Sequence, residues 1–271
     1  MRVGGAAAIT ALTLSALGLV PRLVGCVGDD DLGRLLLERL RAASIPTGDV
    51  RVVPSSATGV SVAFEAPSRE RSFLMSLGSL ATFDRSMVPR DALVARLVLL
   101  SGYFDVPGLR GEETATMLET IRDAGGRSLL DVGWAPDGWT EPTRTEVLEL
   151  LPLVDVFLPN EAEALHLSGE PEVRAAARAL QERSGGWIVV KRGLEGCLAT
   201  GPDDALAAEP APRVRAVDTT GAGDAFNGAL MLRLSEGAAV PDALGFAAHV
   251  ASTVVARPSS DRYPDRAGLI D

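Results

Sequence analysis

The stretch from Asp218 to Gly228 joins a glycine-rich turn to a carboxylate in a way that suits phosphate chemistry. Its sequence, DTTGAGDAFNG, runs into an apolar segment over 225–234 that is rich in helix formers. A turn at a helix start directs backbone N–H groups and the positive end of the helix dipole at one point, where an anion binds. Asp224 lies in this turn and would repel a phosphate, so a functional Asp224 would accept a proton from an attacking hydroxyl.

Asp224 also fits a second role, as an acid that caps or stabilises the first turn of the helix. Local sequence alone does not separate the two roles. The chain as a whole narrows the chemistry, because it has neither the Gly-x4-Gly-Lys-Ser/Thr pattern of a P-loop nor the His-Arg-Asp loop of protein kinases. The turn therefore predicts an anion site of another type.

The run DTTGAGDAFNGAL, residues 218–230, resembles the C-terminal signature of the ribokinase-like carbohydrate kinases, also called the PfkB group. The resemblance implies that Asp224 is the catalytic base. It also implies that the amides of Gly221, Ala222 and Gly223 form the anion hole, and that Asp224 contacts the substrate as well. The expected reaction is transfer of the γ-phosphoryl group of ATP to a hydroxyl of a sugar or sugar derivative.

The same resemblance implies further cofactor contacts. The oxygens of Asp218 and Thr220 would hold a monovalent cation such as K⁺ beside the anion hole. The nucleotide would contact a scattered set of residues: Lys191, Gly193, Gly196, Thr219 and His249. Two of these have simpler explanations that stay open, since Lys191 could be a solvated side chain at a strand end and His249 a polar residue packed on a helix.

A second motif, Asn160-x-x-Glu163, follows an apolar strand predicted over 153–158. At a helix start this spacing puts both side chains on one face. Mg²⁺ prefers oxygen ligands and keeps several waters, so an amide and a carboxylate can organise it through water. The same pattern is also a common helix cap. Its match to the family's magnesium motif favours the metal role.

Gly4 and Gly5 match the spacing of the family's N-terminal signature and are expected to contact the sugar-like substrate. One position differs, because Ile9 stands where the signature has an asparagine that hydrogen-bonds the sugar, and isoleucine makes no hydrogen bond. Family members usually carry one more strand ahead of the double glycine, with an acid that binds sugar hydroxyls. Two explanations stand: a start codon assigned too late, or a shortened and impaired protein.

Strands alternating with helices indicate a mostly parallel sheet with its ligands at the carboxyl ends of the strands. The expected fold is a Rossmann-like three-layer α/β/α sandwich of ribokinase type, formed as a single domain over residues 1–271. A small, reduced β lid is expected within 50–80. The main predicted strands are 50–53, 59–64, 72–77, 97–100, 128–132, 153–158 and 187–191, and the last helices are 225–234 and 242–256.

Composition limits the partners. A net charge of −10 leaves no basic surface for nucleic acid, so none is expected to bind. The apolar run 6–20 is too short to span a membrane and lacks a cleavage site, which favours a buried helix over a signal peptide. Cys26 and Cys197 form no metal-binding pattern and are interpreted as free thiols of a cytoplasmic protein without membrane contact.

The functional expectation is therefore a sugar kinase that uses ATP and Mg²⁺. Two alternatives remain. A nucleoside kinase of the same fold would prefer nucleosides as acceptors, and a nucleotide-binding protein that has lost catalysis would account for Ile9 and the absent strand. A homodimer through the lid is also expected, because an exposed sheet edge invites pairing.

Overall fold

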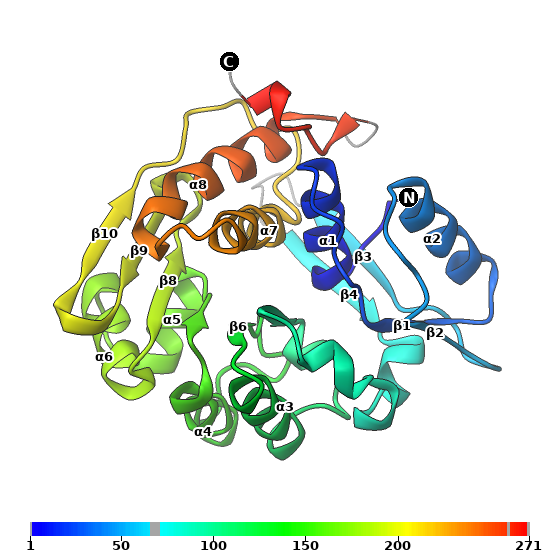
Figure 1. The fold of residues 1–271 in the computed structure, drawn as a ribbon, viewed down its shortest axis with the longest axis horizontal. Helices are drawn as coiled ribbons and strands as arrows, with labels where there is room; N and C mark the ends of the chain where they lie inside the picture. Colours follow the sequence, from blue (N-terminus) through cyan, green and yellow to red (C-terminus); the bar gives the residue numbers. More distant parts are fainter. Residues whose placement is uncertain (1, 66–70, 259–260, 270–271) are drawn as a thin grey trace.

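The computed structural model describes the chain except for residues 1, 66–70, 259–260 and 270–271 (Figure 1). Its main sheet has the strand order β10-β9-β8-β7-β6-β5. The strands β5 to β8 are parallel, whereas β9 pairs antiparallel with β8 and β10 pairs antiparallel with β9. The bounds are β5 Leu97–Ser101, β6 Arg127–Asp131, β7 Val156–Phe157, β8 Trp187–Lys191, β9 Cys197–Thr200 and β10 Leu206–Glu209.

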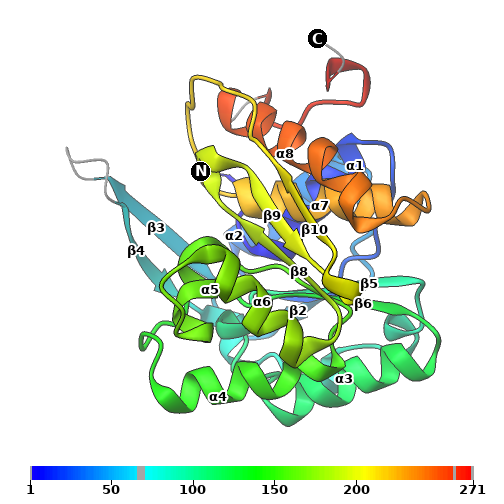
Figure 2. The ribbon, with the colours of Figure 1, turned by 90° about the vertical axis from the view of Figure 1, so that its left-hand side faces the viewer.

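Helices cover both faces of this sheet (Figures 1 and 2). One face carries α3 Glu112–Asp123, α4 Glu141–Leu150, α5 Glu161–Ser168 and α6 Val173–Ser184. The other carries α1 Ala6–Ala16, α7 Ala222–Ser235 and α8 Val240–Ala256. The predicted three-layer sandwich with a mostly parallel sheet is thus confirmed. The strand expected over 153–158 is shorter, because residues 151–153 form a 3₁₀ turn before β7.

The alternation of side chains along each strand explains why two helical layers are needed. On β6, Leu129 packs with α7 and α8, while its neighbour Leu130 packs with the layer of α3 to α6. On β8, Val189 and Val190 divide in the same way. Successive side chains of a strand point to opposite faces, so an apolar run such as this must be buried on both sides.

A smaller parallel pair, β1 Gly25–Gly28 and β2 Val50–Val53, lies apart from the main sheet with α2, Asp31–Ala42. The side chain of Asp30 accepts a hydrogen bond from the Gly33 amide at 2.8 Å, which makes it the N-cap of α2. The hairpin of β3 Val60–Glu65 and β4 Arg71–Ser76 projects from the body of the molecule (Figure 2). Strands were expected in this region, and the structure contains them.

The apolar run at the start of the chain forms α1, as expected. Leu12 and Leu14 are among the buried residues of this helix. In the part of the chain that the structure describes, no helix combines the length and apolar character needed to cross a membrane. Neither Cys26 nor Cys197 forms a disulfide.

Candidate active site

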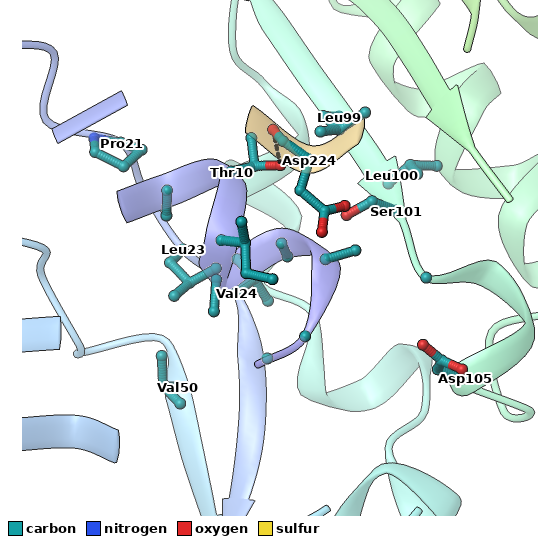
Figure 3. Close-up of a pocket in the computed structure, with 18 of the residues that line it drawn as sticks. Thr10, Pro21, Leu23, Val24, Val50, Leu99, Leu100, Ser101, Asp105 and Asp224 are labelled. Carbon is teal, nitrogen blue, oxygen red and sulfur yellow. Dashed lines mark hydrogen bonds between the residues drawn. The ribbon is translucent and has the colours of Figure 1, made fainter. Parts of the chain in front are cut away.

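A cavity of about 1480 Å³ opens beside the first turn of α7 (Figure 3). Within the described residues, β1 pairs only with β2 and β5 only with β6, and both strands border this cavity with their other edge. The walls are largely apolar, with Val24 and Leu99 among them, and Gly4 and Gly5 line it too. The polar groups that face the space include Asp224, Ser101, Asp105, Thr10 and Thr220.

The first turn of α7 presents open backbone N–H groups. Gly221 is its N-cap with a left-handed φ of 79°, and no side chain caps this end. A β-carbon on Gly221 would lie 3.1 Å from Ile9 Cδ1, so glycine suits the site for both its backbone and its size. The Ala222 amide donates to the Thr219 carbonyl at 3.3 Å, but no acceptor among the described residues takes the N–H of Gly221 or Gly223. This geometry suits an anion.

The Asp224 carboxylate points into the cavity near Ser101 (Figure 3). Its backbone carbonyl accepts a hydrogen bond from Thr10 Oγ1 at 3.1 Å, whereas no donor in the described part of the chain reaches its carboxylate. Burial and the charges of Asp131 and Asp105 outweigh Lys191 and raise the pKa of Asp224 to about 6. A capping acid would accept a backbone hydrogen bond, so these contacts favour the proton-acceptor role.

The Lys191 side chain lies close to the first turn of α7 and is only 13% exposed, so it is not a solvated side chain at a strand end. Its ammonium pairs with Asp131 at 2.6 Å and donates to Asn227 Oδ1 at 3.5 Å, while Asn227 Nδ2 donates to Asp131. A β-carbon on Gly223 would be 3.5 Å from Lys191 Nζ. Burial lowers the pKa of Lys191, but Asp131 and Glu163 outweigh it and the pKa lies above its ordinary value. A fixed positive charge therefore adjoins the start of α7.

Asn160 and Glu163 form a capping box at the start of α5. Asn160 Oδ1 accepts from the Glu163 amide at 2.9 Å, and Glu163 Oε2 accepts from the Asn160 amide at 2.9 Å. Glu163 is only 3% exposed, and burial together with Asp131 raises its pKa to about 7 against the effect of Lys191. The carboxylate keeps free lone pairs, so the pair fits Mg²⁺ through water rather than by direct ligation.

Asp218 and Thr220, which were expected to hold a monovalent cation, precede the N-cap Gly221 of α7, and two arginines reach them. The Asp218 carboxylate pairs with Arg2 and, at 3.5 Å, with Arg262. Arg262 also donates to the backbone carbonyls of Asp218, at 3.0 Å, and of Thr220. Burial opposes the effect, but hydrogen bonds from Thr220 and the two guanidinium charges lower the pKa of Asp218 to about 2.

The other residues predicted to contact the nucleotide differ in their exposure to solvent. Gly193 and Thr219 are exposed, and His249 is half-buried on α8. Gly196 is buried with φ 83°, and a β-carbon there would lie 1.9 Å from the Glu209 carbonyl oxygen. Close packing against β10 therefore accounts for this glycine.

Several residues of the candidate site were not predicted from the sequence, among them Thr10, Asp105, Asn227 and Arg262. Asn227 lies inside the motif that was singled out, so its position in the sequence could have marked it. Asp105 and Arg262 come from segments without a recognisable pattern, and only the fold brings them to α7.

A three-layer α/β/α sandwich with a carboxylate and open amides at one helix start defines the class as a ribokinase-fold protein. The family model described as "pfkB family carbohydrate kinase" matches residues 1–265. This chain therefore belongs to the PfkB family of carbohydrate kinases. The expected family membership and fold are confirmed.

Individual proteins similar to this chain are also kinases of this family. The ribokinase of Haemophilus influenzae is 26% identical over 272 residues, which cover 97% of this chain and 84% of that protein. The aminoimidazole riboside kinase of Salmonella typhimurium is 29% identical, with coverage of 86% and 73%. The structure of Arabidopsis thaliana ribokinase complexed with ribose and ATP has a TM-score of 0.86 and 26% identity, covering 99% of this chain and 86% of that one.

Proposed function

We propose that this protein is an ATP-dependent kinase that phosphorylates a hydroxyl of a sugar or sugar derivative. The observation that carries the proposal is the Asp224 carboxylate, which is half-buried, faces the cavity and lacks a hydrogen-bond donor among the described residues. A carboxylate that is shielded from water and has no hydrogen-bond donor destabilises the folded state, so its presence favours a functional role. Family membership and the sugar bound in a solved relative support the sugar as acceptor.

In this mechanism Asp224 accepts the proton of the acceptor hydroxyl. The amides of Gly221 and Gly223 stabilise the charge of the transferring group, together with the amide of Ala222 once it leaves the Thr219 carbonyl. Bound ATP supplies the phosphoryl group and Mg²⁺ neutralises its charge. Asn160 and Glu163 would orient the metal's water ligands, and Lys191 adds a fixed positive charge at the helix start.

The acceptor is tested by measuring ADP release from Mg·ATP over a panel of sugars, sugar acids and nucleosides. Stimulation by one sugar supports the proposal and names the substrate. A preference for nucleosides would instead support a nucleoside kinase of the same fold. Two observations favour this alternative: the similarity to a riboside kinase and the largely apolar cavity of about 1480 Å³. ATP binding without turnover on any acceptor would support the loss of catalysis suggested by Ile9, which packs against Gly221.

The pH dependence of kcat/KM should report Asp224. The base works only when ionised, and its pKa is raised to about 6, so activity should fall tenfold per pH unit below about pH 6 and be level above pH 7. The measurement is kcat/KM between pH 5 and 8 with the best acceptor. An acid limb near pH 4, the ordinary range of an aspartate, would contradict this environment for Asp224.

The hairpin β3–β4 is proposed as a lid and as a dimer contact. Ser61 and Met75 of the hairpin line the cavity, whereas Val62, Phe64 and Leu74 share the opposite face and are 45%, 56% and 66% exposed. An apolar strip of this kind favours a second copy of the chain.

Phe64→Glu combined with Leu74→Glu should therefore convert a dimer to a monomer, because two carboxylates would be buried without partners at the contact. Light scattering during size-exclusion chromatography measures the mass. Val20→Glu, at an apolar residue 62% exposed outside the hairpin, is the matched control and should leave the mass unchanged. A wild-type protein that is monomeric at all concentrations would refute the contact.

We place the active protein in the cytoplasm, where ATP is supplied and thiols such as Cys197 stay reduced.

A further inference from the structure

The oxygens expected to hold a monovalent cation surround a side chain of the protein itself. Arg262 Nη2 donates to the carbonyl oxygens of Asp218, at 3.0 Å, and of Thr220, and Arg262 Nη1 lies 3.5 Å from Asp218 Oδ2. Three oxygens of the loop before α7 thus converge on one guanidinium. Backbone carbonyls and a carboxylate are the ligands that a K⁺ ion would use, so the donor set is suited to a cation but already has one.

The burial of the Arg262 side chain indicates that its guanidinium has defined partners. The Arg262 side chain is only 3% exposed, and arginines are rarely buried to this extent without a defined charge partner. Its partners belong to the loop that leads into Gly221, the N-cap of α7. Arg2 reaches the same carboxylate from the other end of the chain, but its hydrogen bond is to the carboxylate rather than to a carbonyl. Arg262 therefore holds the loop backbone, whereas the hydrogen bond that Arg2 donates to this loop goes to the Asp218 side chain.

We propose that Arg262 takes the place of the monovalent cation, so that this kinase carries the charge beside its anion hole as a permanent part of the chain. A guanidinium stays protonated throughout the working pH range and needs no ion from solution. It would fix the carbonyls of Asp218 and Thr220 and add positive charge next to the phosphoryl site. The inference rests on the proposed kinase function for its role in catalysis, but not for its prediction about cation binding.

The first test compares rates in KCl with those in the chloride of a bulky organic cation at equal ionic strength. The wild type should turn over equally fast, within about twofold, in both salts. Arg262→Ala should lose at least tenfold in the organic salt and recover most of that loss in KCl or with added guanidinium chloride. A wild-type rate that rises several-fold with K⁺ would overturn the proposal, as would an Arg262→Ala variant that no cation rescues.

A second readout does not depend on activity. The melting temperature of Arg262→Ala should rise by about 3–6 °C when the K⁺ concentration reaches roughly ten times the Kd for K⁺. An ion that binds only the folded state stabilises that state. The wild type and Arg2→Ala, which keep the Arg262 guanidinium in place, should show no such rise. If no acceptor is ever phosphorylated but these melting curves behave as described, the kinase function fails and the Arg262 inference stands. A K⁺-dependent rise in the wild type would refute the inference by itself.

Discussion

Replacement of Asp224 by asparagine is expected to lower turnover by about 10² to 10⁴-fold, the usual effect of losing a general base. Asparagine keeps the size of the side chain but cannot accept the proton. The fold should not suffer. The pKa of Asp224 is raised to about 6 in the folded chain, so the ionised carboxylate costs stability above that pH, and Asp224→Asn should melt no lower than the wild type at pH 8.

The control is Asp242→Asn, which removes another first-turn acid, from α8 instead of α7. Rates should be measured as ADP release with the best acceptor, and melting curves should be recorded on the same samples. A small effect of Asp224→Asn, within tenfold of the wild type, would show that Asp224 is not the base. A loss of activity accompanied by a lower melting temperature would point to the helix-stabilising role instead.

The geometry of the candidate site was predictable from the sequence where it lies within one motif. Asp224, Gly221 and Gly223 lie within a single turn, so their types and spacing carry the geometry with them. The strands were predictable for a similar reason, because runs such as 187–191 are apolar throughout and therefore buried on both faces. Family membership was predictable from short motifs as well, above all from residues 218–230, together with Gly4-Gly5 and the Asn160/Glu163 pair.

The contacts between segments were not predictable. Lys191 and Asp131 are 60 residues apart, and Asn227 lies 96 residues from Asp131, yet the three meet because the carboxyl ends of parallel strands converge on α7. Lys191 was expected at the nucleotide, and the sequence offered no means of pairing it with Asp131. Similarly, Arg262 reaches Thr220 across 42 residues from an irregular segment that has no motif.

Lys191→Met is expected to have the second large effect, a loss on the order of 10² in kcat, as when a preorganised group that stabilises the transition state is removed. The Lys191 side chain is 13% exposed and its partner Asp131 is 9% exposed, so the charge acts in a region with little water. The acid limb should also move above pH 6. Lys191 lowers the pKa of Asp224 against burial, Asp131 and Asp105, and these three remain in the variant.

A single substitution would also leave Asp131 buried without its cation, which by itself costs about 3–5 kcal/mol of stability. The double variant Lys191→Met with Asp131→Asn separates the two effects, because it removes both charges. Its acid limb should return toward pH 6, since Asp131 no longer raises the pKa of Asp224. Its kcat should stay low if the ammonium acts on the transferring group, and Arg233→Met at the far end of α7 should leave kcat unchanged. Full recovery of kcat in the double variant would mean that Lys191 serves only to neutralise Asp131.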